Sequence, residues 1–212
     1  MLNFIKQNFK KIFILLFLLF MLILVSSINY ATITINNISD NVFRLHIIAN
    51  SDLAKDQELK YKVRDSILEY INNSDIDTNK KSDIMLFVQN NKSDLYDIAK
   101  KVILENGFDY DVSISIGKFN FPTKTYADIS LPAGTYDALR VEIGNANGQN
   151  WWCVMFPPLC FIDTTTGIVP EESKELLENN LDSEEYKLIS DTSNSELQVK
   201  FKIVEFINSL ID

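Results

Sequence analysis

Histidine and cysteine are scarce in this chain, which has one histidine and two cysteines in 212 residues. A structural zinc site needs about four His, Cys or carboxylate ligands, so these residues cannot form one without carboxylate help. A single histidine also excludes the His-Glu-x-x-His zinc motif. We therefore expect no metal and no cofactor.

Common catalytic motifs are missing as well. The sequence has no Gly-x-Gly-x-x-Gly, no phosphate-binding loop ending in Gly-Lys-Ser/Thr and no Gly-x-Ser-x-Gly elbow. Acidic pairs such as Glu171-Glu172 and Glu184-Glu185 are expected in a chain with 29 acidic residues, and such side chains usually face solvent. We assign no catalytic acid.

Positive charge is sparse after residue 31. Beyond that point 17 basic residues face 29 acidic ones, which gives a formal charge of −12. Such a domain repels nucleic-acid phosphates and anionic lipid headgroups. We therefore expect no nucleic-acid partner, and a macromolecular partner should present a neutral or basic surface.

The first 31 residues have the parts of an export signal. Lys6, Lys10 and Lys11 precede an unbroken apolar run at 12–25, and Ser26 and Ser27 follow it. The run reaches only residue 28, which is short for a membrane-spanning helix of about 20 residues. Residues 1–31 are thus either a signal peptide or an N-terminal membrane anchor centred on 12–28. In both cases the lysines keep the N-terminus in the cytoplasm and residues 32–212 are exported.

The exported part shows both helical and strand periodicity. Its first strand is predicted at 42–49, where the odd-numbered residues are apolar and should meet the core, while Arg44 and His46 share the other face. Further strands are predicted at 110–116, 136–143 and 151–156, with an extended edge segment at 119–128. The turn at 145–148 predicts that the last two strands form a hairpin.

Apolar residues at helical spacing predict the helices. They lie at 55–71, with Lys60 on the solvent side, and from 82 to 105, where a weak stretch at 90–93 can split the second helix. Segment 171–195 predicts short helices and loop, and 196–211 a final helix. The fold class is α+β: a single domain with a mostly antiparallel sheet packed against two or three helices.

Six residues are candidates for contact with a receptor. Arginine and large aromatics contribute most to binding energy at interfaces, and the polar residues of the first strand gather near its end. The indoles of two adjacent strand residues must point to opposite faces, so one can fill the core while the other is exposed. The candidates are Arg44, His46, Asn50, Asp52, Trp151 and Trp152.

Cys153 and Cys160 allow two interpretations. Export removes them from reducing thiols, so they can form a disulfide across the Pro-Pro turn; they can equally be two small buried hydrophobes. A third use, a nucleophilic thiolate beside His46, would require an imidazole partner and a lowered thiol pKa, which apolar surroundings oppose.

Two long blocks resemble stage II sporulation protein R. The first is residues 44–52 (Arg-Leu-His-Ile-Ile-Ala-Asn-Ser-Asp) with 56–65; the second is 131–144 (Leu-Pro-Ala-Gly-Thr-Tyr-Asp-Ala-Leu-Arg-Val-Glu-Ile-Gly) with 148–161. The resemblance spans most of 40–161 and extends to the C-terminal helix.

The resemblance implies a non-catalytic sporulation signal. Such a protein is made in the forespore and secreted across the forespore membrane into the intermembrane space. There it stimulates a membrane-bound aspartic protease of the mother cell, which processes the precursor of the sporulation sigma-E factor. The family brings no catalytic residues to carry over. Two other hypotheses stay open: an exported cell-envelope hydrolase using His46 with a cysteine or carboxylate, and an anchored structural protein that self-assembles through its C-terminal helix.

Overall fold

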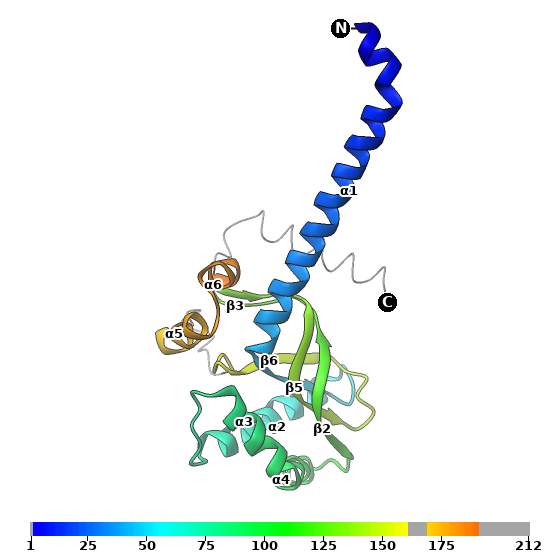
Figure 1. Ribbon diagram of the computed structural model, residues 1–212. Coiled ribbons are helices and arrows are strands. Elements are labelled where there is room, and N and C mark those ends of the chain that lie inside the picture. Colours follow the sequence, from blue (N-terminus) through cyan, green and yellow to red (C-terminus); the bar gives the residue numbers. More distant parts are fainter. Residues whose placement is uncertain (1, 161–168, 191–212) are drawn as a thin grey trace.

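The computed structural model describes residues 2–160 and 169–190. The first helix, α1 (Leu2–Asp40), is continuous through residue 31 and projects from the rest of the molecule (Figure 1). Its segment Asn8–Asp40, 33 residues long, is apolar enough to cross a membrane. At about 1.5 Å per residue it is longer than the roughly 30 Å of bilayer hydrocarbon. The C-terminal end of α1 packs against the domain, where Ile35 and Ile38 are buried.

A four-stranded mixed sheet forms the centre of the domain. Its strands are β1 (Phe43–Ile48), β2 (Val112–Phe121), β5 (Gly134–Ile143) and β6 (Asn150–Phe156), in the order β2-β5-β1-β6. β1 runs parallel to β5 and antiparallel to β6, and β2 runs antiparallel to β5. The α+β class is thereby confirmed, with antiparallel contacts in two of the three strand pairs.

The expected hairpin between the last two strands is wrong. β5 and β6 are joined by the turn at 144–149, but β1 lies between them and pairs with both. The parallel β1–β5 pairing joins residues about 94 positions apart, such as Leu45 and Leu139. A local turn signal cannot reveal that a distant strand inserts between its two neighbours.

One face of the sheet carries the main core. α2 (Ala54–Asn72), α3 (Lys81–Asn90) and α4 (Lys92–Glu105) cover it, as Figure 1 shows below the strands. The fourfold-spaced residues Leu59, Val63 and Ile67 of α2 pack against the odd-numbered residues of β1. The predicted split of the second helix is confirmed by the break between α3 and α4.

The opposite face carries a second core. It is covered by the end of α1, by the small hairpin of β3 (Lys124–Tyr126) and β4 (Ile129–Leu131), and by α5 (Glu171–Asn180) and α6 (Ser183–Ser190). β1 is therefore buried on both faces, so Arg44 and His46, predicted to share the face away from the main core, are buried as well. The helix predicted at 196–211 lies outside the described residues.

Candidate functional site

The C-terminal end of β1 is held by a buried carboxylate. Asp56, in the first turn of α2, is 1% exposed. It accepts hydrogen bonds from Asn50 Nδ2 (2.9 Å), from Ser51 Oγ (2.6 Å) and from the Tyr110 hydroxyl (3.1 Å). Burial raises the pKa of Asp56, but the three hydrogen bonds outweigh burial and hold the pKa below its usual value. Asp56 thus ties the loop after β1 to α2 as a charged group with three partners.

Loop 144–149, between β5 and β6, is bonded to the same place. The Asn145 N–H donates to Asn50 Oδ1 (3.0 Å), and the Gln149 N–H donates to Asp52 Oδ1 (2.8 Å). Asn50 and Asp52, two of the receptor candidates, therefore each use a side-chain oxygen in a hydrogen bond to another part of the same domain. The two sequence blocks that carry the family resemblance meet at this point.

Two glycines permit this close approach. Gly144 has φ +58°, and a Cβ there would overlap Asn50 Oδ1; a Cβ on Gly148 would overlap the Ser51 carbonyl oxygen. The Gly148 N–H also donates to the Ala49 carbonyl (2.9 Å). Only glycine combines the left-handed conformation at 144 with contact this close to another backbone at 148.

Lys60 is buried at the edge of the same network. It is 2% exposed, so its predicted place on the solvent side of α2 is wrong. Its ammonium donates to Gln57 Oε1 (2.6 Å) and to the Gln149 carbonyl (3.1 Å), because loop 144–149 closes over this part of the helix. Burial lowers the pKa of Lys60, and the charge of Arg64 lowers it further, against an opposing effect of Asp52.

Arg44 lies fully buried on the second face of the sheet. Its Nη2 donates to the Tyr126 hydroxyl (2.7 Å), and its guanidinium lies 4.1 Å from the ring centroid of Phe121 and 4.7 Å from that of Tyr136. Nε and Nη1 are buried and have no hydrogen-bond partner in the described part of the chain. Arg44 is thus a cation enclosed by aromatic rings, with donors left over.

His46 sits two residues along the same face and is 6% exposed. Its ring stacks on Trp152 at a centroid distance of 3.8 Å, and its Nε2 lies 2.7 Å from Asn150 Oδ1. Burial lowers the pKa of His46 to about 4; repulsion by Arg140 and Arg44 adds to this, while the bond to Asn150 opposes it. The imidazole is therefore neutral near pH 7 and donates from Nε2 to the Asn150 amide oxygen.

The two tryptophans face opposite sides of β6, as strand geometry requires. Trp152 stacks on His46, and Trp151 packs toward α2, where the Arg64 guanidinium lies 4.4 Å from its ring centroid and Tyr61 meets it edge-on at 5.3 Å. Both indoles are half-buried. Of the six receptor candidates, these two therefore keep the largest apolar surface in reach of a partner.

A cysteine–histidine dyad does not form here. Cys153 and Cys160 are joined in a disulfide with a Cα–Cα distance of 5.3 Å, which leaves neither as a thiolate. The ring nitrogen Nε2 of His46 is bonded to an amide and not to a carboxylate. The groups that the hydrolase hypothesis requires are thus not assembled around His46 in the described residues.

Sequence reasoning missed the residues that organise the site. Nothing local marks Asp56 as buried, because an acid in the first turn of a helix is ordinary, and Tyr126 and Phe121, which enclose Arg44, lie in the segment predicted only as extended. The tight packing of Gly144 and Gly148 was not foreseen either. The available signal was the resemblance itself, because Asn50, Ser51 and Asp56 lie in its first block and Gly144 and Gly148 in its second.

The comparisons with known proteins agree with this arrangement. A family model described as stage II sporulation protein R matches residues 39–166, which include both blocks and the buried network. The chain belongs to this family. It is 33% identical over 187 residues to stage II sporulation protein R of Bacillus subtilis (strain 168), an alignment that covers 82% of this chain and 83% of that protein. No solved structure matches it.

Membership of the stage II sporulation protein R family makes this a sporulation protein. The family name indicates no catalysis. The apolar helix at its N-terminus fits a signal or a membrane anchor.

Proposed function

We propose that this protein is an exported sporulation signal that activates a membrane-bound aspartic protease of the mother cell, which then processes the precursor of sigma-E. The single observation that carries the proposal is family membership across residues 39–166 behind an N-terminal apolar helix. In this role the chain is a non-catalytic activator, secreted across the forespore membrane into the intermembrane space.

The charge distribution supports this direction of transport. The basic residues of the first 31 positions precede the apolar run, and no acidic residue accompanies them. Such an arrangement keeps the N-terminus on the cytoplasmic side. The body that follows then lies on the side of the membrane opposite the cytoplasm, where its disulfide is stable.

Activation from outside a membrane requires differential binding. The signal must bind the active arrangement of the protease more tightly than the inactive one, and a difference of about 3 kcal/mol shifts the ratio of the two states by about 150-fold. Trp151 and Trp152 are the candidates we retain for this contact, because they combine partial exposure with rigid aromatic area. Arg44, Asn50 and Asp52 have a structural role in this proposal: they stabilise β1 and loop 144–149, which position the two tryptophans.

Co-expression in a non-sporulating host tests the proposal. The host makes the candidate protease and the sigma-E precursor, together with this chain, with the chain lacking residues 1–31, or with neither. We expect precursor cleavage only with the complete chain. Cleavage without this chain, or no cleavage with a complete, folded and exported chain, would contradict the proposal.

Two alanine variants separate a binding signal from a hydrolase. His46→Ala should reduce precursor cleavage only in proportion to any loss of folded protein, because His46 is a neutral, buried ring. Trp152→Ala should reduce cleavage in folded, exported protein if the indole contacts the protease. Complete loss of function in folded His46→Ala protein would instead favour the hydrolase.

A further inference from the structure

The outer edge of β2 is open along its whole length in the described structure. β2 is the longest of the edge strands, with ten residues, and it pairs with β5 on one side only. The Gly144 N–H donates to the Asp111 carbonyl, so odd-numbered residues turn their backbone groups toward β5. Even-numbered residues turn theirs outward, which agrees with the Tyr110 carbonyl accepting a bond from Lys100 (2.9 Å) of α4.

The outward backbone groups of β2 are left without partners by the described residues. They belong to Val112, Ile114, Ile116, Lys118 and Asn120. A row of free N–H and C=O groups at two-residue spacing is the template that another extended chain pairs with. Edge strands of native proteins usually contain proline, bulges or several charges, which prevent pairing with another chain. β2 has no proline, no register shift and one lysine.

An open groove lies beside this edge. It has a volume of about 490 Å³ between the first turns of α4 and the first half of β2. Lys92, Ser93 and Tyr96 line its helical side, and Val112, Ser113 and Ile114 line its strand side. A strand added to β2 would place every second side chain over this groove, beside Tyr96, while Ser115 and Gly117 leave room on the other face.

We propose that an extended segment of the activated partner protein adds to β2 as a fifth strand of the sheet. The inference rests on the proposed function and adds a second contact surface, at the edge of the sheet opposite β6 with its Trp151 and Trp152. Asp109 and Asp111, whose side chains are 92% and 100% exposed, flank the start of β2, and Lys100 partly neutralises them. The fitting segment is thus β-branched and apolar where it meets the groove, with a lysine or arginine near these aspartates.

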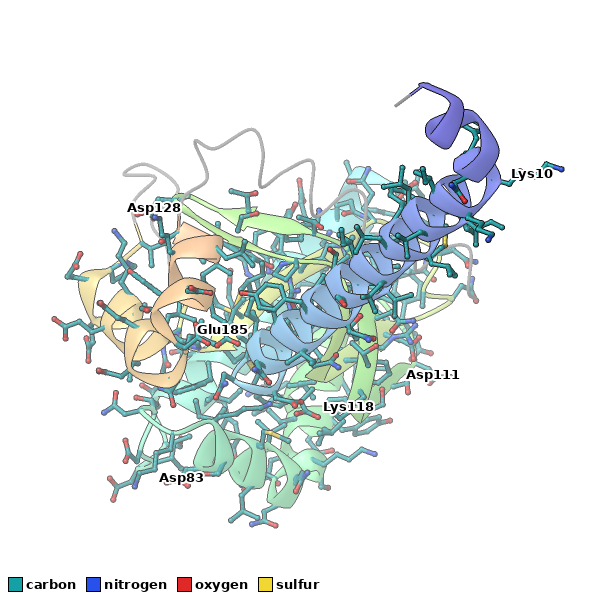
Figure 2. All side chains as sticks on the ribbon, turned by 45° about the horizontal axis from the view of Figure 1, so that its top comes forward. Lys10, Asp83, Asp111, Lys118, Asp128 and Glu185 are labelled. Carbon is teal, nitrogen blue, oxygen red and sulfur yellow. A yellow bond between two sulfur atoms is a disulfide. The ribbon has the colours of Figure 1, made fainter. Side chains whose placement is uncertain are left out.

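A second copy of this chain is disfavoured at the same edge, because residues 32–212 carry a formal charge of −12 and two copies repel each other. Lys118 pairs with Asp40 of α1 (3.3 Å), and Gly134, opposite Phe121, abuts Ile35, so α1 leaves the domain at the C-terminal end of β2. Figure 2 also places Asp111 on the side of the domain opposite Asp128 and Glu185, away from α6.

Two substitutions at one exposed position test the strand addition. Lys118→Pro removes an outward N–H without removing a bond to β5, whereas Lys118→Ala removes only the side chain, which is 58% exposed. Both variants are compared with wild type in sporulating cells whose own copy is deleted, by mother-cell sigma-E reporter activity, and in the co-expression host, by precursor cleavage. Asn120→Pro and Asn120→Ala repeat the comparison, should Lys118→Pro fail to fold.

We expect the proline variant to be folded and exported but about tenfold less active than its alanine control, the effect of losing about one hydrogen bond. Equal activity of folded proline and alanine variants would overturn the strand addition while leaving the proposed function intact. If wild type restores the reporter in sporulating cells but causes no cleavage in the co-expression host, the proposed function fails. In that case reporter activity in sporulating cells still tests the strand addition. Lower activity of the proline variant than of the alanine variant supports it, and equal activity overturns it.

Discussion

The two ends of β1 bury charge in opposite ways. At the C-terminal end, Asp56 is surrounded by three donors that match its oxygens. Toward the N-terminal end, Arg44 is enclosed by aromatic rings and keeps two nitrogens without a partner among the described residues. A satisfied buried network rigidifies a fold, whereas a partly satisfied one adds little net stability. The buried charges beside the two ends of one strand therefore differ in what they contribute to stability.

Replacing Asp56 by alanine should have the largest effect. Three buried donors would lose their acceptor, and we expect the free energy of unfolding to fall by about 4 kcal/mol. Denaturant titration of the complete chain in detergent measures this. The control is Asp65→Ala, because the Asp65 side chain is 62% exposed and, within residues 2–160 and 169–190, pairs with Arg64 alone. Equal losses in the two variants would contradict the role given to Asp56.

Acid should weaken the fold through His46. Its pKa is about 4 when folded and about 6.5 when unfolded, so the unfolded chain binds more protons between these values. The stabilisation is complete above pH 6.5 and is lost as the pH falls to about 4, by up to about 3 kcal/mol. Asp56, whose pKa is lowered, loses its contribution only at lower pH.

The variant His46→Gln isolates this effect. Its free energy of unfolding should be flatter than that of wild type between pH 6.5 and 4, when both are measured by denaturant titration at each pH. Parallel curves for the two proteins would show that His46 is not the group responsible.

A methyl group on Gly148 should cost about 2 kcal/mol of unfolding free energy. The added Cβ would collide with the Ser51 backbone, which cannot move without disturbing the contacts of Asp56. Gly117→Ala is the matched control, because a Cβ there meets nothing within 4 Å and alanine suits a strand better than glycine. In thermal unfolding, Gly148→Ala should lower the Tm relative to wild type. Gly117→Ala should raise the Tm or leave it near the wild-type value.

Replacing Arg44 by methionine should have the smallest effect. Methionine keeps the apolar contacts with Phe121 and Tyr136 and removes two donors that have no partner in the described residues, at the cost of the one hydrogen bond to Tyr126. We expect a change of about 1 kcal/mol or less in the free energy of unfolding, of either sign. A loss as large as that of Asp56→Ala would show that the guanidinium is fully satisfied in the native protein.

Local sequence patterns predicted the elements better than their pairing. The spacing of Leu59, Val63 and Ile67 indicated α2, and the alternation before Gly117 indicated β2, because both depend on neighbouring residues alone. The place of β1 between β5 and β6 depends on contacts about 94 residues apart, and no local rule encodes them.

The same limit applies to the site. The family resemblance marked the blocks around Asn50 and Trp151, but it could not show that Asn50 bonds Asp56 or that Arg44 is covered by Tyr126 from a separate hairpin. Burial of a polar side chain depends on which distant segment covers it. The boundary between signal or anchor and exported domain at residues 31 and 32 stays a prediction, and the structure adds that α1 passes through it unbroken.

The central claim is that this chain switches on a protease from across a membrane, and reconstitution tests it most directly. The protease and the sigma-E precursor are placed with one membrane, and this full-length protein is placed in an opposed membrane. The exported body of this protein then faces the external side of the protease. The account predicts that precursor cleavage rises when the wild-type body is present on that side and stays at background when it is absent. Cleavage that is unchanged by the body would contradict it.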